Sequence, residues 1–78
     1  MADAPTLDEI VDLARDVLET DVVSRDSNWF GLGGDSLTAL QFSILIEENW
    51  GYLVDVADIT EAASFSELHR SLIDSRTH

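Results

Sequence analysis

Residues 28–42 read NWFGLGGDSLTALQF, and within this stretch a glycine-containing turn is followed by an apolar segment. Gly33 and Gly34 allow the backbone to turn, and Asp35 is a residue type that often caps the N-terminus of a helix. These signals predict a helix that begins at Ser36 and runs to about Asn49.

The predicted helix is apolar on two faces. One face carries Ala39, Phe42, Ile46 and Trp50, and the other carries Leu37, Leu40 and Ile44. Such a helix either lies at the centre of a bundle or keeps one face for a partner. Periodicity leaves both possibilities open for the second face, which belongs to the core or docks a partner. The candidate docking surface consists of Phe30, Leu32, Leu37, Leu40, Gln41 and Ile44.

The rest of the chain predicts an all-α fold. Helical periodicity and capping signals indicate helices over residues 6–20 and about 65–74, with one short helix in residues 57–63. Residues 21–35 form a long loop, and residues 52–56 an extended connector. The expected architecture is a small four-helix bundle of three main helices and one short helix, with a long loop between the first two. It is a single domain over residues 1–78 with a core of about 6–74, and residues 1–4 and 75–78 are expected to fray.

Apolar residues in the non-helical segments predict how these segments pack. The loop contains Val22, Val23, Trp29, Phe30 and Leu32, which are expected to fold back onto the helices. Tyr52, Val54 and Val56 of the connector are expected to point inward.

The composition excludes several classes of partner. Sixteen acidic residues against four arginines give the 78-residue chain a formal charge of −12. Such a surface repels nucleic acid and anionic membranes, and attracts proteins with basic docking patches. No apolar run is long enough to span a membrane, and no signal peptide is visible. The chain lacks cysteine, which fits a reducing compartment, and we expect a cytoplasmic monomer.

Ser36 has three possible roles: a residue that only begins a helix, a hydrolase nucleophile, or an attachment point. Residues 34–37 spell GDSL, the signature of a family of esterases and lipases. That family takes its base from an Asp-x-x-His sequence, and neither His69 nor His78 has an aspartate at this spacing. Hydrolysis is therefore disfavoured, and both histidines are interpreted as surface residues. A hydroxyl at a helix N-terminus, next to small glycines, favours attachment of a phosphate-linked group.

The chain resembles the thiolation domain, or peptidyl carrier protein, of nonribosomal peptide synthesis, within the acyl carrier protein superfamily. The resemblance rests on WFGLGGDSLTALQF, on EENWGYLVDVADI and on ASFSELHRSL, and it covers nearly the whole chain. It implies that Ser36 carries 4′-phosphopantetheine donated from coenzyme A, supported by the motif residues Gly33, Gly34, Asp35 and Leu37. It further implies a carrier without catalytic residues or metal ligands of its own. The implied partners are a phosphopantetheinyl transferase, an adenylation enzyme, and condensation or tailoring enzymes.

Some positions depart from the peptidyl carrier pattern. Asp55 and Ala63 stand where peptidyl carriers often have prolines, and Gln41 and Leu45 replace common arginines. Together with the strong negative charge, these differences make the chain similar to the acyl carriers of fatty acid and polyketide synthesis. An acyl carrier is therefore the alternative to a peptidyl carrier. A third hypothesis is an unmodified acidic helical docking domain.

Overall fold

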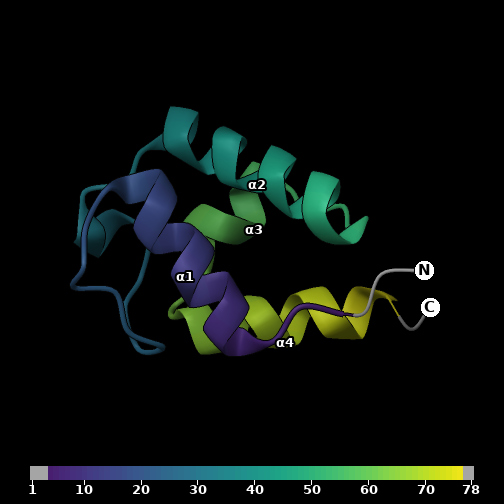
Figure 1. The fold of residues 1–78 in the computed structure, drawn as a ribbon. Coiled ribbons are helices and arrows are strands. Elements are labelled where there is room, and N and C mark those ends of the chain that lie inside the picture. Colours follow the sequence, from purple (N-terminus) through teal and green to yellow (C-terminus); the bar gives the residue numbers. More distant parts are fainter. Residues whose placement is uncertain (1–3, 77–78) are drawn as a thin grey trace.

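Four α-helices and one short 3₁₀-helix make up the computed structural model, which describes residues 4–76 (Figure 1). The elements are α1 (Leu7–Leu18), η1 (Phe30–Leu32), α2 (Ser36–Trp50), α3 (Val56–Glu61) and α4 (Phe65–Arg76). The prediction of an all-α four-helix bundle with a long first loop is confirmed. The fraying predicted for residues 1–3, 77 and 78 lies outside the described residues, and α4 continues past its predicted end to Arg76.

Helix α1 begins and ends at residues with clear local causes. The Thr6 hydroxyl accepts from the Glu9 amide at 3.1 Å, while the Glu9 carboxylate accepts from the Thr6 amide at 2.9 Å. This reciprocal pair satisfies backbone donors that have no partner within the helix. The helix ends at Leu18 because Glu19 adopts a left-handed conformation, with φ of 53°. The predicted end at residue 20 is therefore slightly too late.

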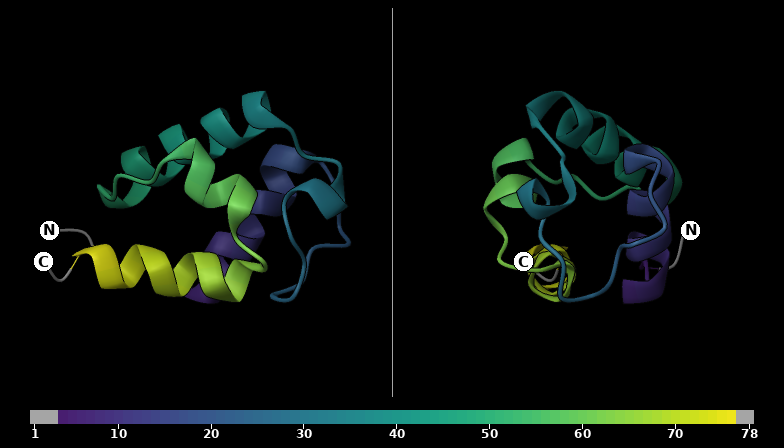
Figure 2. Two further views of the ribbon diagram at one scale, coloured as in Figure 1. Left: turned by 180° about the vertical axis from the view of Figure 1, so that it is seen from behind. Right: turned by 90° about the vertical axis from the view of Figure 1, so that its left-hand side faces the viewer.

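The helices pack around one core. Helix α1 contacts both α2 and α4, and α3 lies against α2 (Figure 2). The buried apolar side chains come from every α-helix, the long loop and the connector after α2: Ile10, Val11, Ala14, Val23, Trp29, Ala39, Phe42, Ile46, Tyr52, Ile59, Phe65, Leu68 and Leu72. At the centre, Trp29 stacks on Phe42 with ring centroids 4.9 Å apart, and Phe65 meets both rings edge-on. Stacked and edge-on contacts add to the hydrophobic stabilisation of such a cluster.

The long loop is anchored at one end of the bundle, where α2 begins (Figure 1). The amides of Phe65 and Ser66, at the start of α4, donate to the carbonyls of Ser27 and Arg25 at 3.1 and 3.0 Å. Val23 and Trp29 of the loop are buried as predicted. The prediction is wrong for Val22 and Phe30, which are 77% and 59% exposed. Loop backbone bonds and one large indole already hold this loop, so these two side chains are left facing solvent.

The connector between α2 and α3 packs inward, in agreement with the alternating pattern. Tyr52 is buried, and Val54 and Val56 are half-buried against the core. The Ser43 hydroxyl of α2 donates to the Val54 carbonyl at 2.5 Å. Helix α3 begins at Val56, one residue before the predicted segment, and ends at Glu61.

His69 has a structural role that the sequence analysis did not predict. Its ring is half-buried, and Nε2 donates to the carbonyl of Pro5 at 2.8 Å. This bond joins α4 to the segment that precedes α1. The interpretation of His69 as a surface residue is therefore wrong, while His78 lies outside the described residues.

Candidate functional site

Ser36 is the first residue of α2, and a reciprocal cap holds the backbone around it. The amide of Thr38 donates to the carboxylate of Asp35 at 2.9 Å, and the amide of Asp35 donates to the hydroxyl of Thr38 at 2.9 Å. The predicted capping role of Asp35 is confirmed by these contacts. Thr38 was missed in the sequence, although an N-cap aspartate followed three positions later by a polar side chain is a capping signal.

The Asp35 carboxylate lies next to the serine and is charged at neutral pH. The Thr38 amide, followed by the Thr38 hydroxyl, lowers the pKa of Asp35 from its usual value because both donate to the ionised carboxylate. The carboxylate is thus committed to the backbone of the first helical turn. A capping function accounts for this acid without any role as a general base.

The two glycines before the cap are required for different reasons. Gly33 has a φ of 87°, in the left-handed region that favours glycine, and its amide donates to the Phe30 carbonyl at 3.0 Å. No described atom lies within 4 Å of the position that a Cβ would take at Gly33, so this side of the turn is open. Gly34 is buried instead, and a Cβ there would lie 2.4 Å from Nε1 of Trp29. Gly33 is therefore required by its backbone conformation, and Gly34 by its close contact with the indole.

The Ser36 hydroxyl is exposed and available to an external reagent. Among the described residues, no group forms a hydrogen bond with it. The one histidine whose position is described, His69, is bonded to Pro5 between α4 and the N-terminal segment. Within residues 4–76, no histidine is placed to act as the base that a serine hydrolase requires at Ser36. The arrangement suits a hydroxyl that another enzyme modifies.

The second apolar face of α2 is exposed. Leu37, Leu40 and Ile44 are 64%, 47% and 47% exposed, whereas Ala39, Phe42 and Ile46 are completely buried. The hypothesis that Leu40 and Ile44 belong to the core is therefore wrong. Gln41 and Phe30 are also exposed, while Leu32 is half-buried and packs against the core. Residues 36–46 contain no charged side chain, so this face is apolar within a strongly acidic protein.

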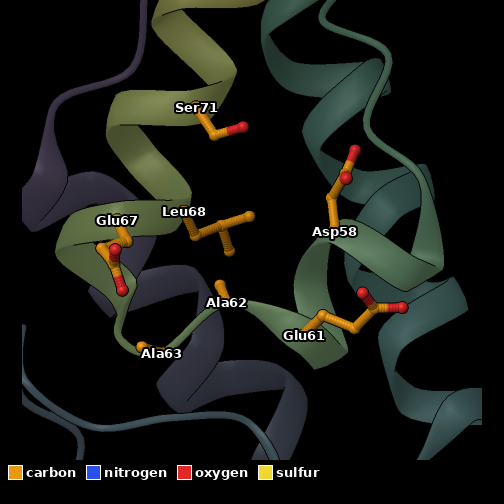
Figure 3. Close-up of a pocket in the computed structure, with 7 residues that line it drawn as sticks. All are labelled: Asp58, Glu61, Ala62, Ala63, Glu67, Leu68 and Ser71. Atoms are coloured by element: carbon orange, nitrogen blue, oxygen red, sulfur yellow. The ribbon is translucent and has the colours of Figure 1, made fainter.

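A pocket in the structure is not lined by Ser36. It has a volume of about 450 Å³ and lies between α3 and α4, lined by Asp58, Glu61, Ala62, Ala63, Glu67, Leu68 and Ser71. Figure 3 shows Leu68 directed into this space, opposite Asp58. Its three carboxylates repel a phosphate, so the pocket is a poor site for a phosphate-linked group.

The described part of the chain shows neither a membrane-spanning helix nor a metal-binding cluster. Within residues 4–76, no helix is both long and apolar enough to cross a bilayer. In the same part of the chain, His, Asp and Glu side chains form no group of three that could hold a metal ion.

Comparison with known proteins agrees with this geometry. The family model described as "Phosphopantetheine attachment site" matches residues 8–72, which include the whole of α2 and its cap. The nonribosomal peptide synthetase rstn8 of Penicillium ochrochloron is 43% identical over 67 residues, which cover 82% of this chain. The chain spans only 3% of the length of that synthetase. No solved structure matches the chain.

Proposed function

Because the chain belongs to the phosphopantetheine-attachment family, we propose that it is a peptidyl carrier protein whose 4′-phosphopantetheine arm is attached to Ser36. The observation that carries the proposal is the exposed and unbonded Ser36 hydroxyl, which lies at the start of α2 within a chain that matches the family over residues 8–72. The similarity to a nonribosomal peptide synthetase favours aminoacyl or peptidyl cargo over fatty acyl cargo.

The residues around Ser36 fit the arm. In the attachment step, the serine oxygen attacks the phosphorus of the pyrophosphate in coenzyme A that bears pantetheine. The P–O bond to the adenosine-phosphate half breaks, and the serine proton passes to a base of the transferase. The phosphodiester would be attached at the N-terminus of α2, where the helix dipole favours an anion by about 0.3–1 kcal/mol. The arm supplies a terminal thiol that holds the cargo as a thioester, which the chain itself cannot supply because it has no cysteine.

The Asp35 carboxylate opposes part of this dipole effect. Water screens the interaction between two exposed charges, so the repulsion by the Asp35 carboxylate is weak. The helix end therefore tolerates the phosphate without strongly attracting it. We propose that a phosphopantetheinyl transferase provides the catalytic groups, and that this chain contributes the positioned hydroxyl.

We propose that partner enzymes dock on the surface formed by Phe30, Leu32, Leu37, Leu40, Gln41 and Ile44, called here the α2 face. Its members lie around the start of α2 and along its exposed side. The acidic remainder of the protein steers basic partners, while the apolar α2 face supplies the contact. Adenylation enzymes and condensation or tailoring enzymes are the partners that a peptidyl carrier requires. A small interface of this type allows quick release after each transfer.

The cargo assignment has a direct test. The phosphopantetheinylated protein is offered to a panel of amino-acid adenylation enzymes and, separately, to fatty acyl loading enzymes. We expect intact mass spectrometry to show aminoacyl thioesters and no fatty acyl thioester. Exclusive loading with fatty acyl groups would identify an acyl carrier and contradict the peptidyl assignment.

The α2 face predicts that Leu40→Ala weakens docking without weakening the fold. Leu40 is half exposed, so truncation is expected to change stability by no more than about 0.5 kcal/mol. Because Leu40 lies at the centre of the proposed contact, its truncation is expected to raise the KM of the transferase for this protein by about tenfold, with kcat retained. Steady-state loading kinetics with coenzyme A measure both constants.

Leu53→Ala is the matched control for Leu40→Ala. Leu53 is 80% exposed and lies in the connector after α2, outside the α2 face. Its truncation is expected to leave the KM unchanged. Equal KM values for the two variants would show that partners dock elsewhere.

A further inference from the structure

Trp29 bonds to the backbone of the two consecutive residues that lead to Ser36. Its carbonyl accepts from the amide of Gly34 at 3.1 Å, and its indole Nε1–H donates to the carbonyl of Asp35 at 3.0 Å. We infer that Trp29 is a positioning residue that fixes the backbone from which the Ser36 side chain projects, and so places its hydroxyl for phosphopantetheinylation. The inference rests on the proposed attachment at Ser36 and adds a requirement within the protein for that reaction.

The contact with Asp35 acts directly on Ser36 because the peptide group is planar. The Asp35 carbonyl and the Ser36 amide belong to one peptide group, so holding the carbonyl oxygen also orients the bond that leads to the Ser36 Cα. The same oxygen accepts from the Ala39 amide of α2 at 3.0 Å. Among the residues that the structure describes, the indole of Trp29 is the donor that joins this peptide group to the loop and the core.

The indole is itself held rigidly. Trp29 is 1% exposed, stacks on Phe42 at 4.9 Å and meets Phe65 edge-on at 6.2 Å. Because a Cβ at Gly34 would lie 2.4 Å from Nε1, the ring and the turn are in direct contact with no free space between them. The aromatic core thus determines where the turn before Ser36 lies.

The substitution Trp29→Phe distinguishes the positioning role of the indole N–H from the packing role of the aromatic ring. A phenyl ring at position 29 retains most of the aromatic contact with Phe42 and Phe65, but it has no N–H to donate. The Asp35 carbonyl would still accept from the Ala39 amide, so this acceptor is not left without a partner. Trp29→Phe is therefore expected to fold, with a less restrained peptide group before Ser36.

The test compares Trp29→Phe with Trp50→Phe in loading by a phosphopantetheinyl transferase and coenzyme A. Trp50 is half-buried at the opposite end of α2, which makes it a matched tryptophan-to-phenylalanine control. We expect Trp29→Phe to lower kcat by about tenfold or more, because small errors in the position of a reacting group cost up to about a hundredfold. The KM is expected to stay unchanged, since Leu37, Leu40 and Ile44 on the α2 face are untouched. Trp50→Phe is expected to match the wild type in both constants.

Two results would overturn the inference: a kcat for Trp29→Phe equal to that of Trp50→Phe, or a raised KM with kcat unchanged. Circular dichroism and thermal melting show whether Trp29→Phe is folded. If it is unfolded, β-(3-benzothienyl)alanine is incorporated at position 29 in the Trp50→Phe background. This amino acid keeps the bicyclic ring of tryptophan and replaces its N–H by sulfur. The same fall in kcat is then expected, and loading at the wild-type rate would overturn the inference. A failure of the proposed function would be distinguishable from a failure of this inference, because the wild type itself would then gain no mass from coenzyme A.

Discussion

Ser36→Ala is expected to abolish the mass increase of about 340 Da that the wild type gains from coenzyme A and a phosphopantetheinyl transferase. The variant removes the only atom to which the arm is proposed to be attached. Because the Ser36 hydroxyl is exposed and makes no hydrogen bond with the described residues, the variant is expected to keep its fold. Intact mass spectrometry after coexpression measures the outcome as all or none.

A matched serine variant makes this result specific. Ser71 is exposed on α4, away from the start of α2, and Ser71→Ala is expected to gain the full mass of the arm. A mass gain in Ser36→Ala would move the attachment point to another hydroxyl. The absence of any gain in the wild type would remove the carrier proposal altogether and favour an unmodified docking domain.

Phe42→Ala is expected to destabilise the protein by about 3–5 kcal/mol. Phe42 is completely buried between Trp29 and Phe65, so the truncation leaves a cavity in the centre of the aromatic cluster. A domain of 78 residues has a free energy of unfolding of only about 4–12 kcal/mol. The truncation is therefore expected to remove a large part of the stability of the folded state and to lower the melting temperature clearly.

Ile44→Ala provides the comparison on the same helix. Ile44 is half exposed on the opposite side of α2, and its truncation is expected to cost about 1 kcal/mol or less. Urea titrations followed by circular dichroism measure both free energies of unfolding. Equal losses for the two variants would contradict the division of α2 into a buried and an exposed face.

The helices and the cap were predictable because their signals are local. Thr6 and Glu9 stand at capping-box spacing and form both expected bonds. Asp35 caps α2 as predicted, and the Ser64 hydroxyl accepts from the Glu67 amide at the start of α4. Each of these contacts joins residues three positions apart, which lie close together whenever the chain turns into a helix.

The errors arose where distant segments meet. Phe30 was expected both to fold back with the other apolar loop residues and to belong to the docking surface; it faces solvent, while the adjacent Trp29 is buried in the core. His69 was interpreted as a surface residue, but the carbonyl of Pro5 lies 2.8 Å from its ring. Neither outcome follows from spacing along the chain, because each depends on which distant segments pack against each other in the folded protein.

The sequence by itself determined that the chain is helical, where its main helices lie, and that Ser36 begins one of them behind a glycine turn and an aspartate cap. Only the tertiary structure decided which apolar face of α2 is buried, because Phe42 and Leu40 have the same helical periodicity and only one side of the helix can meet Trp29 and Phe65. It also decided that Trp29 reaches the carbonyl of Asp35, a contact made possible by the loop folding back onto α2. Local hydrogen bonding is encoded within a few residues, whereas burial depends on the packing of the whole chain.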